Sequence, residues 1–303
     1  MKFGVTLPNN WGVEDAQELI SLAKRADELG FSTITVADHL FNVSYVLERI
    51  GDRPYYDPMT TLTYIAAVTS KVGLLTSVLV LPYHNPIRLA KVAATLDVMS
   101  GGRLRLGVGV GVIEQELELM GCSMAQRGAM SDEAIAVMKA LWTQEVPTFE
   151  GKYYRLTGMK FSPKPQQKPH LPLCIGGNSR AAIRRAARVG NAWHPTSRTA
   201  ETLAGEMIYL REQAESNGRD PAEIPVSVRA SVGTPRDPRY TSGRAEASGG
   251  DYSIGYQPQE IIENIGPFQN LGVEEIVLSS NTADTDDIMA MMEMVARDVM
   301  PAF

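Results

Sequence analysis

Cysteine and histidine are both scarce in this chain of 303 residues, which has two cysteines and four histidines. Cys122 and Cys174 lie far apart, without the C-x-x-C spacing of a metal knuckle and in too small a number for a disulfide framework. We expect both to be buried free thiols, because free cysteine behaves as a small hydrophobic residue. Since the histidines also lack the spacing of metal ligands, the sequence predicts no metal site.

Long apolar runs are lacking too. No stretch approaches the ~20 apolar residues that a membrane helix requires. The first residues, MKFGVTLP, start directly with a strand pattern and show no charged segment followed by a long apolar run, so we expect no signal peptide. These observations predict a soluble, cytoplasmic protein.

An excess of positive charge is also missing, since the formal net charge is -6. This balance argues against nucleic acid or an anionic membrane as the main partner. Any anion must therefore be bound by local groups, such as helix N-termini or single arginines.

What the sequence does have is a regular alternation of strand and helix patterns. Eight strand-like runs are each followed by a helical pattern, and no part of the chain consists of strands alone. The predicted strands cover 2–7, 31–37, 72–81, 103–108, 173–175, 191–194, 224–229 and 274–278. This pattern indicates an α/β fold, a (β/α)8 TIM barrel, forming a single domain over residues 1–303. A doubly wound sheet would need fewer strands and a change of composition between the two halves.

Two segments interrupt the alternation. Residues 145–171 are predicted to form an insertion before the fifth strand, with a small hairpin at 148–156 and a proline-rich run, and we expect this insertion to cover one end of the barrel. Residues 231–256 are rich in glycine and proline and are predicted to form a long polar loop, either mobile or a lid.

Candidate site residues follow from the barrel prediction, because active groups of such barrels lie at the carboxyl ends of the strands. The candidates at these ends are Thr6, Asp38, His39, Thr76, Ser77, Val78, Gly109, Val110, Gly111, Gly176, Gly177, Asn178 and Ser179. We expect them to converge on one mouth of the barrel.

The glycines in this set suggest a ligand site. After the fifth strand, Gly176 and Gly177 permit positive φ, Asn178 or Ser179 can cap the helix that follows, and the amides of that helix could hold a phosphate. The alternative is a simple tight turn between strand and helix. The run from Gly107 to Gly111 lacks the Rossmann spacing, and we interpret it as room for a flat ring, although glycine also serves close packing.

His39 is the candidate catalytic residue. Beside Asp38, it could be a proton donor, a hydrogen-bond partner of a heterocycle, or one half of a satisfied polar pair at a strand end. His84 and His194 are weaker candidates of the same kind.

Several motifs together resemble a known family. In chain order they read FGVTLP, ITVADHL, LLTSVLVLPYHNPIRLAKVAATLDVMSGGRLRLGVGVG, AQRG, PLCIGGNS and AARVGNAWHP. They resemble the luciferase-like monooxygenase superfamily, and within it the branch that uses the deazaflavin coenzyme F420. The resemblance extends over most of the chain.

The resemblance implies a cofactor site. It implies a non-proline cis peptide between Ser77 and Val78, behind the central ring of coenzyme F420, with the ring across Asp38, His39, 76–78 and 110–111. The phosphate would lie on 176–179. Arg127 could reach the polar tail of the cofactor, or could form a helix salt bridge instead.

The resemblance also implies an activity: an F420-dependent oxidoreductase that transfers a hydride between the deazaflavin and a small organic substrate. His39 would position or protonate the reacting partner, and the substrate would enter beneath the 145–171 insertion and contact the 41–56 loop. A homodimer is expected from the same resemblance.

One departure concerns the acid and base groups. The sugar-phosphate dehydrogenases of this branch pair such a histidine with a tryptophan four residues later and a glutamate in the glycine-rich turn. Here Val43 and Val112 stand at those places. Two other interpretations therefore stay open: an FMN-dependent monooxygenase, and a non-catalytic protein that binds a flavin or deazaflavin.

Overall fold

Parallel strands alternate with helices around a barrel in the computed structural model, which describes residues 1–233 and 253–303. The strands around the barrel are β1 (Lys2–Thr6), β2 (Thr33–Val36), β3 (Gly73–Thr76), β5 (Leu104–Gly109), β8 (Leu173–Gly176), β9 (Ala192–His194), β10 (Ser227–Ser231) and β11 (Glu275–Ser279). Their spatial order is β10-β11-β1-β2-β3-β5-β8-β9, and the bridges Trp193↔Val226 and Thr196↔Arg229 join the two edges. The predicted TIM barrel is confirmed.

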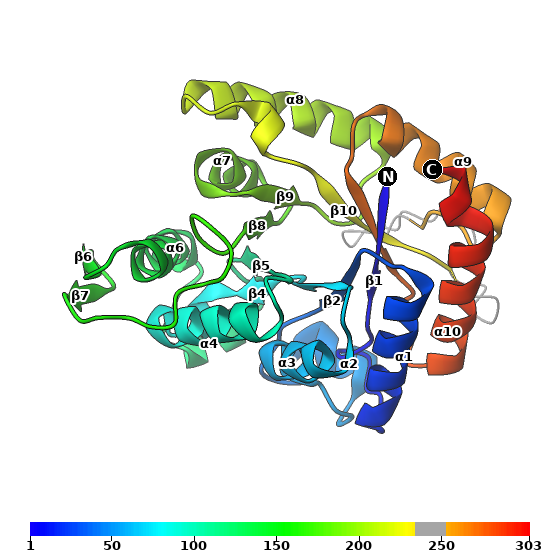
Figure 1. Ribbon diagram of the computed structural model, residues 1–303, viewed down its shortest axis with the longest axis horizontal. Coiled ribbons are helices and arrows are strands. Elements are labelled where there is room, and N and C mark those ends of the chain that lie inside the picture. Colours follow the sequence, from blue (N-terminus) through cyan, green and yellow to red (C-terminus); the bar gives the residue numbers. More distant parts are fainter. Residues whose placement is uncertain (234–252) are drawn as a thin grey trace.

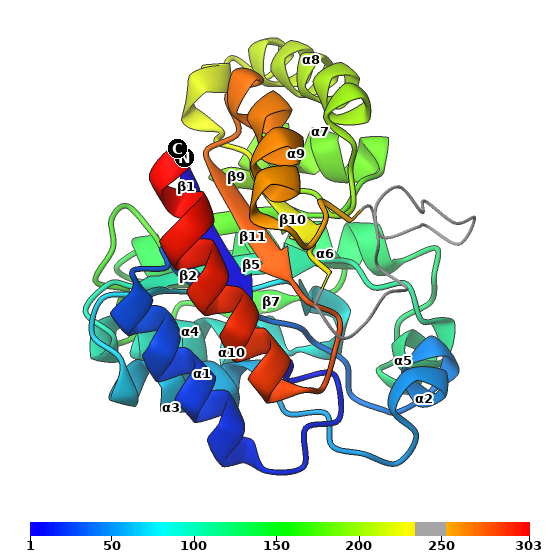
Figure 2. The same ribbon diagram turned by 90° about the vertical axis from the view of Figure 1, so that its right-hand side faces the viewer.

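Helices surround the strands (Figures 1 and 2). The longer ones are α1 (Ala16–Leu29), α3 (Pro58–Val68), α4 (Pro86–Met99), α6 (Arg127–Thr143), α7 (Arg180–Val189), α8 (Ala200–Ser216), α9 (Pro258–Asn270) and α10 (Thr285–Met294). Two short helices that the sequence patterns did not predict, α2 (Ser44–Ile50) and α5 (Glu114–Leu119), lie in loops after β2 and β5. None of the helices described is long and apolar enough to cross a membrane.

Local chemistry sets the helix ends. The Asp15 side chain accepts a hydrogen bond from Gln17 N–H at the start of α1, and Gly30 ends that helix with φ of 83°. At the start of α4, Asn85 caps the helix and Pro86 takes the first helical position, where a missing N–H costs nothing. These ends agree with the predicted helix boundaries.

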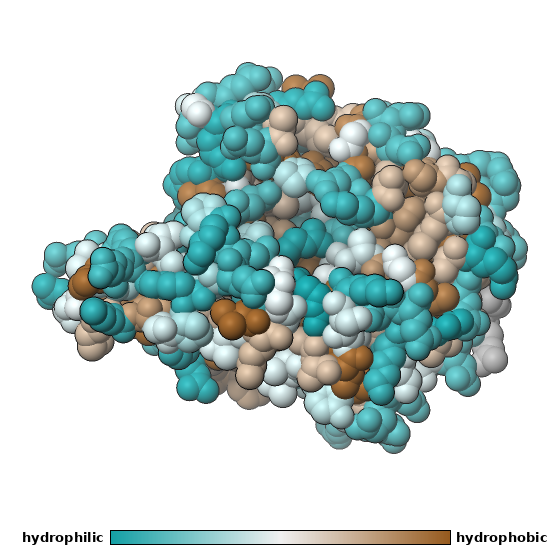
Figure 3. Space-filling view, in the orientation of Figure 1, coloured by the Kyte–Doolittle hydropathy of each residue, from teal (hydrophilic) through white to brown (hydrophobic). Residues whose placement is uncertain are grey.

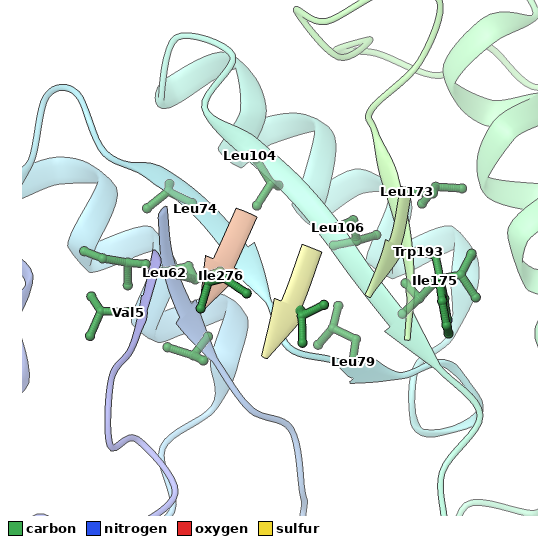
Figure 4. Packing of buried hydrophobic residues seen from close by; sticks show 14 of the residues in the cluster. Val5, Leu62, Leu74, Leu79, Leu104, Leu106, Leu173, Ile175, Trp193 and Ile276 are labelled. Atoms are coloured by element: carbon green, nitrogen blue, oxygen red, sulfur yellow. The ribbon is translucent and has the colours of Figure 1, made fainter. Parts of the chain in front are cut away.

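Apolar side chains on the outward faces of the strands pack against the surrounding helices and form the main buried core (Figure 4). The residues labelled there include Val5, Leu74, Leu79, Leu104, Leu106, Leu173, Ile175, Trp193 and Ile276. The alternate positions face the barrel interior and include the polar residues Thr33, Arg105 and Glu275. Cys122 and Cys174 are both buried free thiols, as predicted.

The 145–171 insertion begins and ends at the amino ends of the strands, opposite to the end predicted for the site. Its hairpin, β6 (Thr148–Glu150) with β7 (Arg155–Thr157), packs beside α6 and protrudes as a largely hydrophilic end of the molecule (Figures 1 and 3). The hairpin runs back along α6, where Glu133 accepts from the N–H groups of Lys152 and Tyr153. Further along, Gln167 hydrogen-bonds to Asp97 and to the carbonyl of Leu104, the first residue of β5. The prediction that the substrate enters beneath this insertion is therefore wrong, because a segment between a helix and the next strand lies at the amino ends of the strands. The predicted 231–256 loop falls for the most part outside the described residues.

The predicted third strand, 72–81, is divided in two. β3 ends at Thr76, the Ser77–Val78 peptide is cis as the resemblance implied, and β4 (Leu79–Val80) continues the pairing with β5. The register advances by five residues from Leu74 to Leu79 but by only four on β5, from Leu104 to Val108. One extra residue is thus accommodated at this point, as in a β-bulge.

Three glycines make room for this segment. A Cβ on Gly107 would lie 1.8 Å from the carbonyl oxygen of Thr76, and Cβ atoms on Gly109 and Gly176 would lie 2.8 and 2.6 Å from methyl groups of Val78. The space beside Gly107 and Gly109 is taken by the chain itself. Their interpretation as room for a flat ring is wrong, and close packing explains them.

A buried ion pair closes the amino end of the barrel. Glu275 is 2% exposed and lies 2.8 Å from the Arg105 guanidinium, beside a pocket of about 390 Å³. Burial by itself would raise the pKa of Glu275, but the charge of Arg105 and the hydroxyls of Thr33 and Ser32 lower that pKa to about 2. The carboxylate is therefore ionised and fully hydrogen-bonded.

Replacing this carboxylate should destabilise the fold. We expect Glu275→Gln to lower the free energy of unfolding by roughly 3 to 5 kcal/mol at pH 7, because it leaves Arg105 without its buried partner. Since the folded pKa of Glu275 is depressed, the difference from wild type should shrink as the pH falls from about 4.5 towards 2. The exposed neighbour Glu274, paired with Lys2, is the control, and Glu274→Gln should cost less than about 1 kcal/mol. Equal losses in urea denaturation would contradict the assignment.

The glycine packing can be tested in the same way. Gly107→Ala should lower the free energy of unfolding by about 1 to 3 kcal/mol or more, because the added methyl group meets a backbone oxygen. Gly266→Ala in α9 should instead be neutral or stabilise by up to about 1 kcal/mol, since its Cβ meets no atom within 4 Å. A Gly107→Ala protein with the wild-type urea midpoint would refute this account of the close contact.

Candidate active site

The predicted site residues gather at the carboxyl ends of neighbouring strands. Since the strands are parallel and adjacent, residues at these ends face the same end of the barrel. Those placed there are Thr6, Asp38, His39, Thr76, Ser77, Val78, Gly109, Val110, Gly111, Gly176, Gly177, Asn178 and Ser179. Arg127, at the start of α6, also lies towards this end of the barrel, and its guanidinium is 2.8 Å from the sulfur of Met124.

Asn9, which the sequence analysis missed, fixes the chain just before the acidic residue at the end of β2. Its side-chain amide donates to the carbonyl of Ala37 and accepts from the Ala37 N–H, both at 2.9 Å. These two hydrogen bonds fix the backbone of Ala37, which directly precedes Asp38 and His39. Thr6 is buried beside it and shares a hydrogen bond of 2.9 Å with Thr35.

Asp38 and His39 do not form a pair with each other. Asp38 is 3% exposed, and its Oδ2 accepts from Val80 N–H at 2.9 Å and lies 2.8 Å from His84 Nε2. The interpretation of Asp38 and His39 as one satisfied polar pair is therefore wrong. His84, a weaker candidate in the sequence, is the partner of Asp38.

His39 is held by a buried carboxylate. Its Nδ1 lies 2.6 Å from Oε2 of Glu116, a fully buried residue of α5. Glu116 also accepts from the backbone N–H groups of Leu40 and Phe41, at 2.8 and 2.9 Å, and from the hydroxyl of Tyr83 at 2.8 Å. Burial acts to raise the pKa of Glu116, but these hydrogen bonds and His39 outweigh it and lower the pKa.

The tautomer of His39 follows from these contacts. Because the Glu116 carboxylate is ionised and accepts hydrogen bonds only, Nδ1 of His39 carries the proton and donates to it. Nε2 of a neutral ring is then an acceptor, and the Tyr45 hydroxyl lies 2.7 Å from it. Burial raises the pKa of Tyr45, so its hydroxyl keeps its proton and donates. The three side chains form a directed line from Tyr45, which is 43% exposed, to the buried carboxylate.

Glu116 is the main functional residue that the sequence analysis missed. The resemblance placed a glutamate in the glycine-rich turn, but Val112 occupies that position and is 69% exposed. Ile113, Glu116 and Leu117 recur at helical spacing and are all buried. In the sequence, the position of Glu116 between apolar residues at helical spacing was the signal that could have indicated a buried carboxylate.

The turn after β8 offers backbone donors to an anion. Gly177 has φ of 106°, and the Ser179 hydroxyl caps α7 by accepting from Ala182 N–H at 3.2 Å. Asn178 holds the turn through a double hydrogen bond with the backbone of Thr196, and the Trp193 indole donates to the carbonyl of Gly177 at 3.0 Å. The first N–H groups of α7 thus point out of a braced turn, which is a general anion-binding arrangement.

Several buried polar atoms at this end of the barrel have no hydrogen-bond partner within the described part of the chain. They include Oδ1 of Asn10, Oδ1 of Asp38, the hydroxyl of Tyr55 and the hydroxyl of Thr196. Tyr55 packs edge-on against His39 at 5.8 Å, and Thr196 is the partner of Asn178. Because buried polar groups are normally satisfied, these atoms indicate where a polar ligand would bind.

Comparisons with known proteins show the family to which the chain belongs. The luciferase-like monooxygenase family model matches residues 1–247. The F420-dependent glucose-6-phosphate dehydrogenase of Kineococcus radiotolerans is 30% identical over 226 residues, which cover 73% of this chain and 65% of that protein. The FMNH(2)-dependent dimethylsulfone monooxygenase of Pseudomonas putida is 27% identical over 250 residues, which cover 77% of this chain and 66% of that protein.

A solved structure shows the same fold. An F420-dependent secondary alcohol dehydrogenase, in complex with an F420-acetone adduct, superposes with a TM-score of 0.82 at 20% identity, over 99% of this chain and 98% of that one. At 20% identity, this structural similarity is evidence for a shared fold only. Since the family model covers most of the chain, the protein belongs to the luciferase-like monooxygenase family.

Proposed function

We propose that this protein is a coenzyme F420-dependent oxidoreductase that transfers a hydride between the deazaflavin and a small organic substrate. The observation that carries the proposal is a set of buried polar atoms without a partner among the described residues: Asp38 Oδ1, the Tyr55 hydroxyl beside the His39–Glu116 pair, and the Thr196 hydroxyl beside the anion-binding turn. The membership in a family with F420-dependent relatives supports it.

The residues present fit such a cofactor. A ring N–H would satisfy Oδ1 of Asp38, and a phosphate would accept from the first N–H groups of α7 and from the hydroxyl of Thr196. Ser77 and Val78 would lie against the ring. The deazaflavin supplies a ring carbon that accepts or donates a hydride.

The protein supplies the proton transfer. In an oxidation, the substrate hydroxyl displaces the Tyr45 hydroxyl from Nε2 of His39 and loses its proton to that nitrogen, and Glu116 stabilises the imidazolium through Nδ1–H. In the reverse direction the same nitrogen returns the proton. Leu40, Phe41 and Tyr45, which are 40 to 44% exposed, provide apolar surface beside His39 and suit an organic substrate.

Two other functions remain as alternatives. An FMN-dependent monooxygenase is favoured by the Pseudomonas putida relative, because the same phosphate turn and the same apolar surface would serve FMN. A protein that only binds the cofactor would not need the His39–Glu116 pair, whose buried carboxylate must be stabilised by four hydrogen-bond donors. That pair favours catalysis.

Cofactor binding can be tested at the cap of α7. Ser179→Asp should keep the cap, since aspartate is as good an N-cap as serine, but its charge should weaken the binding of coenzyme F420 and of FMN at least about tenfold. The matched control Ser179→Thr should stay within about threefold of wild type. Fluorescence of Trp193, whose indole donates to Gly177, would report the titration. Tighter wild-type binding of FMN than of F420 would overturn the choice of cofactor.

Catalysis can be tested at His39. We expect His39→Ala to abolish turnover and Glu116→Gln to lower kcat on the order of 10²-fold or more, because the proton acceptor is removed or loses its carboxylate. Cofactor dissociation constants should remain within about threefold. The control is Glu114→Gln, an exposed carboxylate on the same short helix. Turnover would be followed by deazaflavin absorbance, with a substrate found in a screen of small alcohols and aldehydes, and unchanged kcat in His39→Ala would contradict the role.

A further inference from the structure

A second histidine reaches the candidate site from inside the barrel. His194, at the end of β9, is 3% exposed, and its Nε2 lies 2.9 Å from the hydroxyl oxygen of Ser77. Its Nδ1 lies 2.7 Å from the backbone carbonyl of Ser227 and 3.2 Å from the Ser227 hydroxyl. His194 therefore bridges β3 and β10 through both ring nitrogens.

The positions of the protons on His194 follow from whether each partner atom donates or accepts a hydrogen bond. The Ser227 carbonyl can only accept, and the Ser227 hydroxyl donates to Glu275 at 2.9 Å, so both atoms facing Nδ1 are acceptors. Nδ1 must then carry a proton. Burial lowers the pKa of His194 to about 4, with Arg105 and Arg229 acting in the same sense and Glu275 in the opposite one, so the ring is neutral near pH 7.

The Ser77 hydroxyl is affected directly. With Nδ1 protonated in a neutral ring, Nε2 is a bare acceptor, and the single hydroxyl proton of Ser77 is donated to it. Only the oxygen lone pairs of Ser77 are left for any further contact. Ser77 can therefore accept a hydrogen bond from a ligand but cannot give one.

We propose that His194 is a positioning residue that keeps the Ser77 hydroxyl a hydrogen-bond acceptor towards the bound ring, so that Ser77 selects a ring N–H or O–H donor. This inference rests on the proposed binding of a flavin or deazaflavin. It adds a residue that would touch no ligand and would act only through Ser77. It also explains why a histidine occupies this buried position. An apolar residue would fill the same volume without needing the hydrogen bond to Ser227.

A double-mutant cycle tests the coupling. Dissociation constants for coenzyme F420 and FMN would be measured with wild type, Ser77→Ala, His194→Asn and the double variant. The asparagine amide N–H can replace Nδ1–H as a donor to the Ser227 carbonyl, but the shorter side chain has no atom at the position of Nε2, so Ser77 loses its acceptor. Each single change should weaken the tighter-bound cofactor about five- to tenfold, and the double variant no further, because both remove the same hydrogen bond. The control Ser227→Ala keeps the carbonyl that holds His194 and should stay within about twofold.

Additive losses, or a Ser77→Ala protein that binds as tightly as wild type, would overturn the proposal. The tautomer is an independent readout that needs no cofactor. In a two-bond 1H–15N correlation spectrum of the 15N-histidine protein at pH 7, assigned with His194→Asn, Nδ1 of His194 should be protonated and Nε2 bare. The opposite tautomer or an imidazolium would equally refute the inference. Wild-type protein that binds neither cofactor would contradict the proposed function instead, and the spectrum would still decide the state of His194.

Discussion

The close contact of the Thr76–Val80 segment with β5 and β8 is the constraint on which the site depends. No side chain fits at Gly107, Gly109 or Gly176, so the segment can lie directly on the backbone of its neighbours. Its position sets three others: Ser77 reaches His194, Val80 N–H reaches Asp38, and the chain continues to Tyr83, which donates to Glu116. The position of this one segment thus connects His194, Asp38 and the His39–Glu116 pair.

Buried charge is the second requirement, and the fold meets it in the same way at both ends of the barrel. Glu275 at the amino end accepts from Arg105 and from three hydroxyl groups. Glu116 at the carboxyl end accepts from a histidine, a tyrosine and two backbone N–H groups. An unpaired carboxylate at either place would destabilise the folded protein by several kcal/mol. Because the partners of each carboxylate come from distant parts of the chain, each network forms only when the barrel folds. Asp38 differs, because one of its oxygens is unpartnered among the described residues, and under the proposed function that oxygen would bind the ligand.

The sequence predicted the barrel because strand and helix periods are local properties, and it predicted the strand-end residues because parallel strands bring their carboxyl ends together. The strand pattern alone did not predict the break after Thr76, since LLTSVLV reads as one continuous β-branched and apolar run, and only the family resemblance implied the cis peptide there. Nor did it predict that His39 would pair with Glu116, 77 positions away in the chain. That contact depends on the paths of the loops after β2 and β5, and loop paths follow from tertiary packing. The position of the 145–171 insertion was misjudged although the order of elements already placed it at the amino ends of the strands.

The distribution of charge at the carboxyl end matches an elongated ligand with one anionic end. Asp38 and Glu116 lie after β2 and on α5, so a phosphate placed near His39 would meet two carboxylates. On the other side, α7 carries Arg180, Arg184, Arg185 and Arg188 and no acidic residue, and it begins with free backbone donors behind Ser179. The net charge of -6 is thus no obstacle to binding an anion, because the first N–H groups of α7 would hold it, although Arg185 and Arg188 of this helix are paired with Asp132. Under the proposed function, a ring with N–H groups towards Asp38 and a phosphate towards α7 would satisfy both sides.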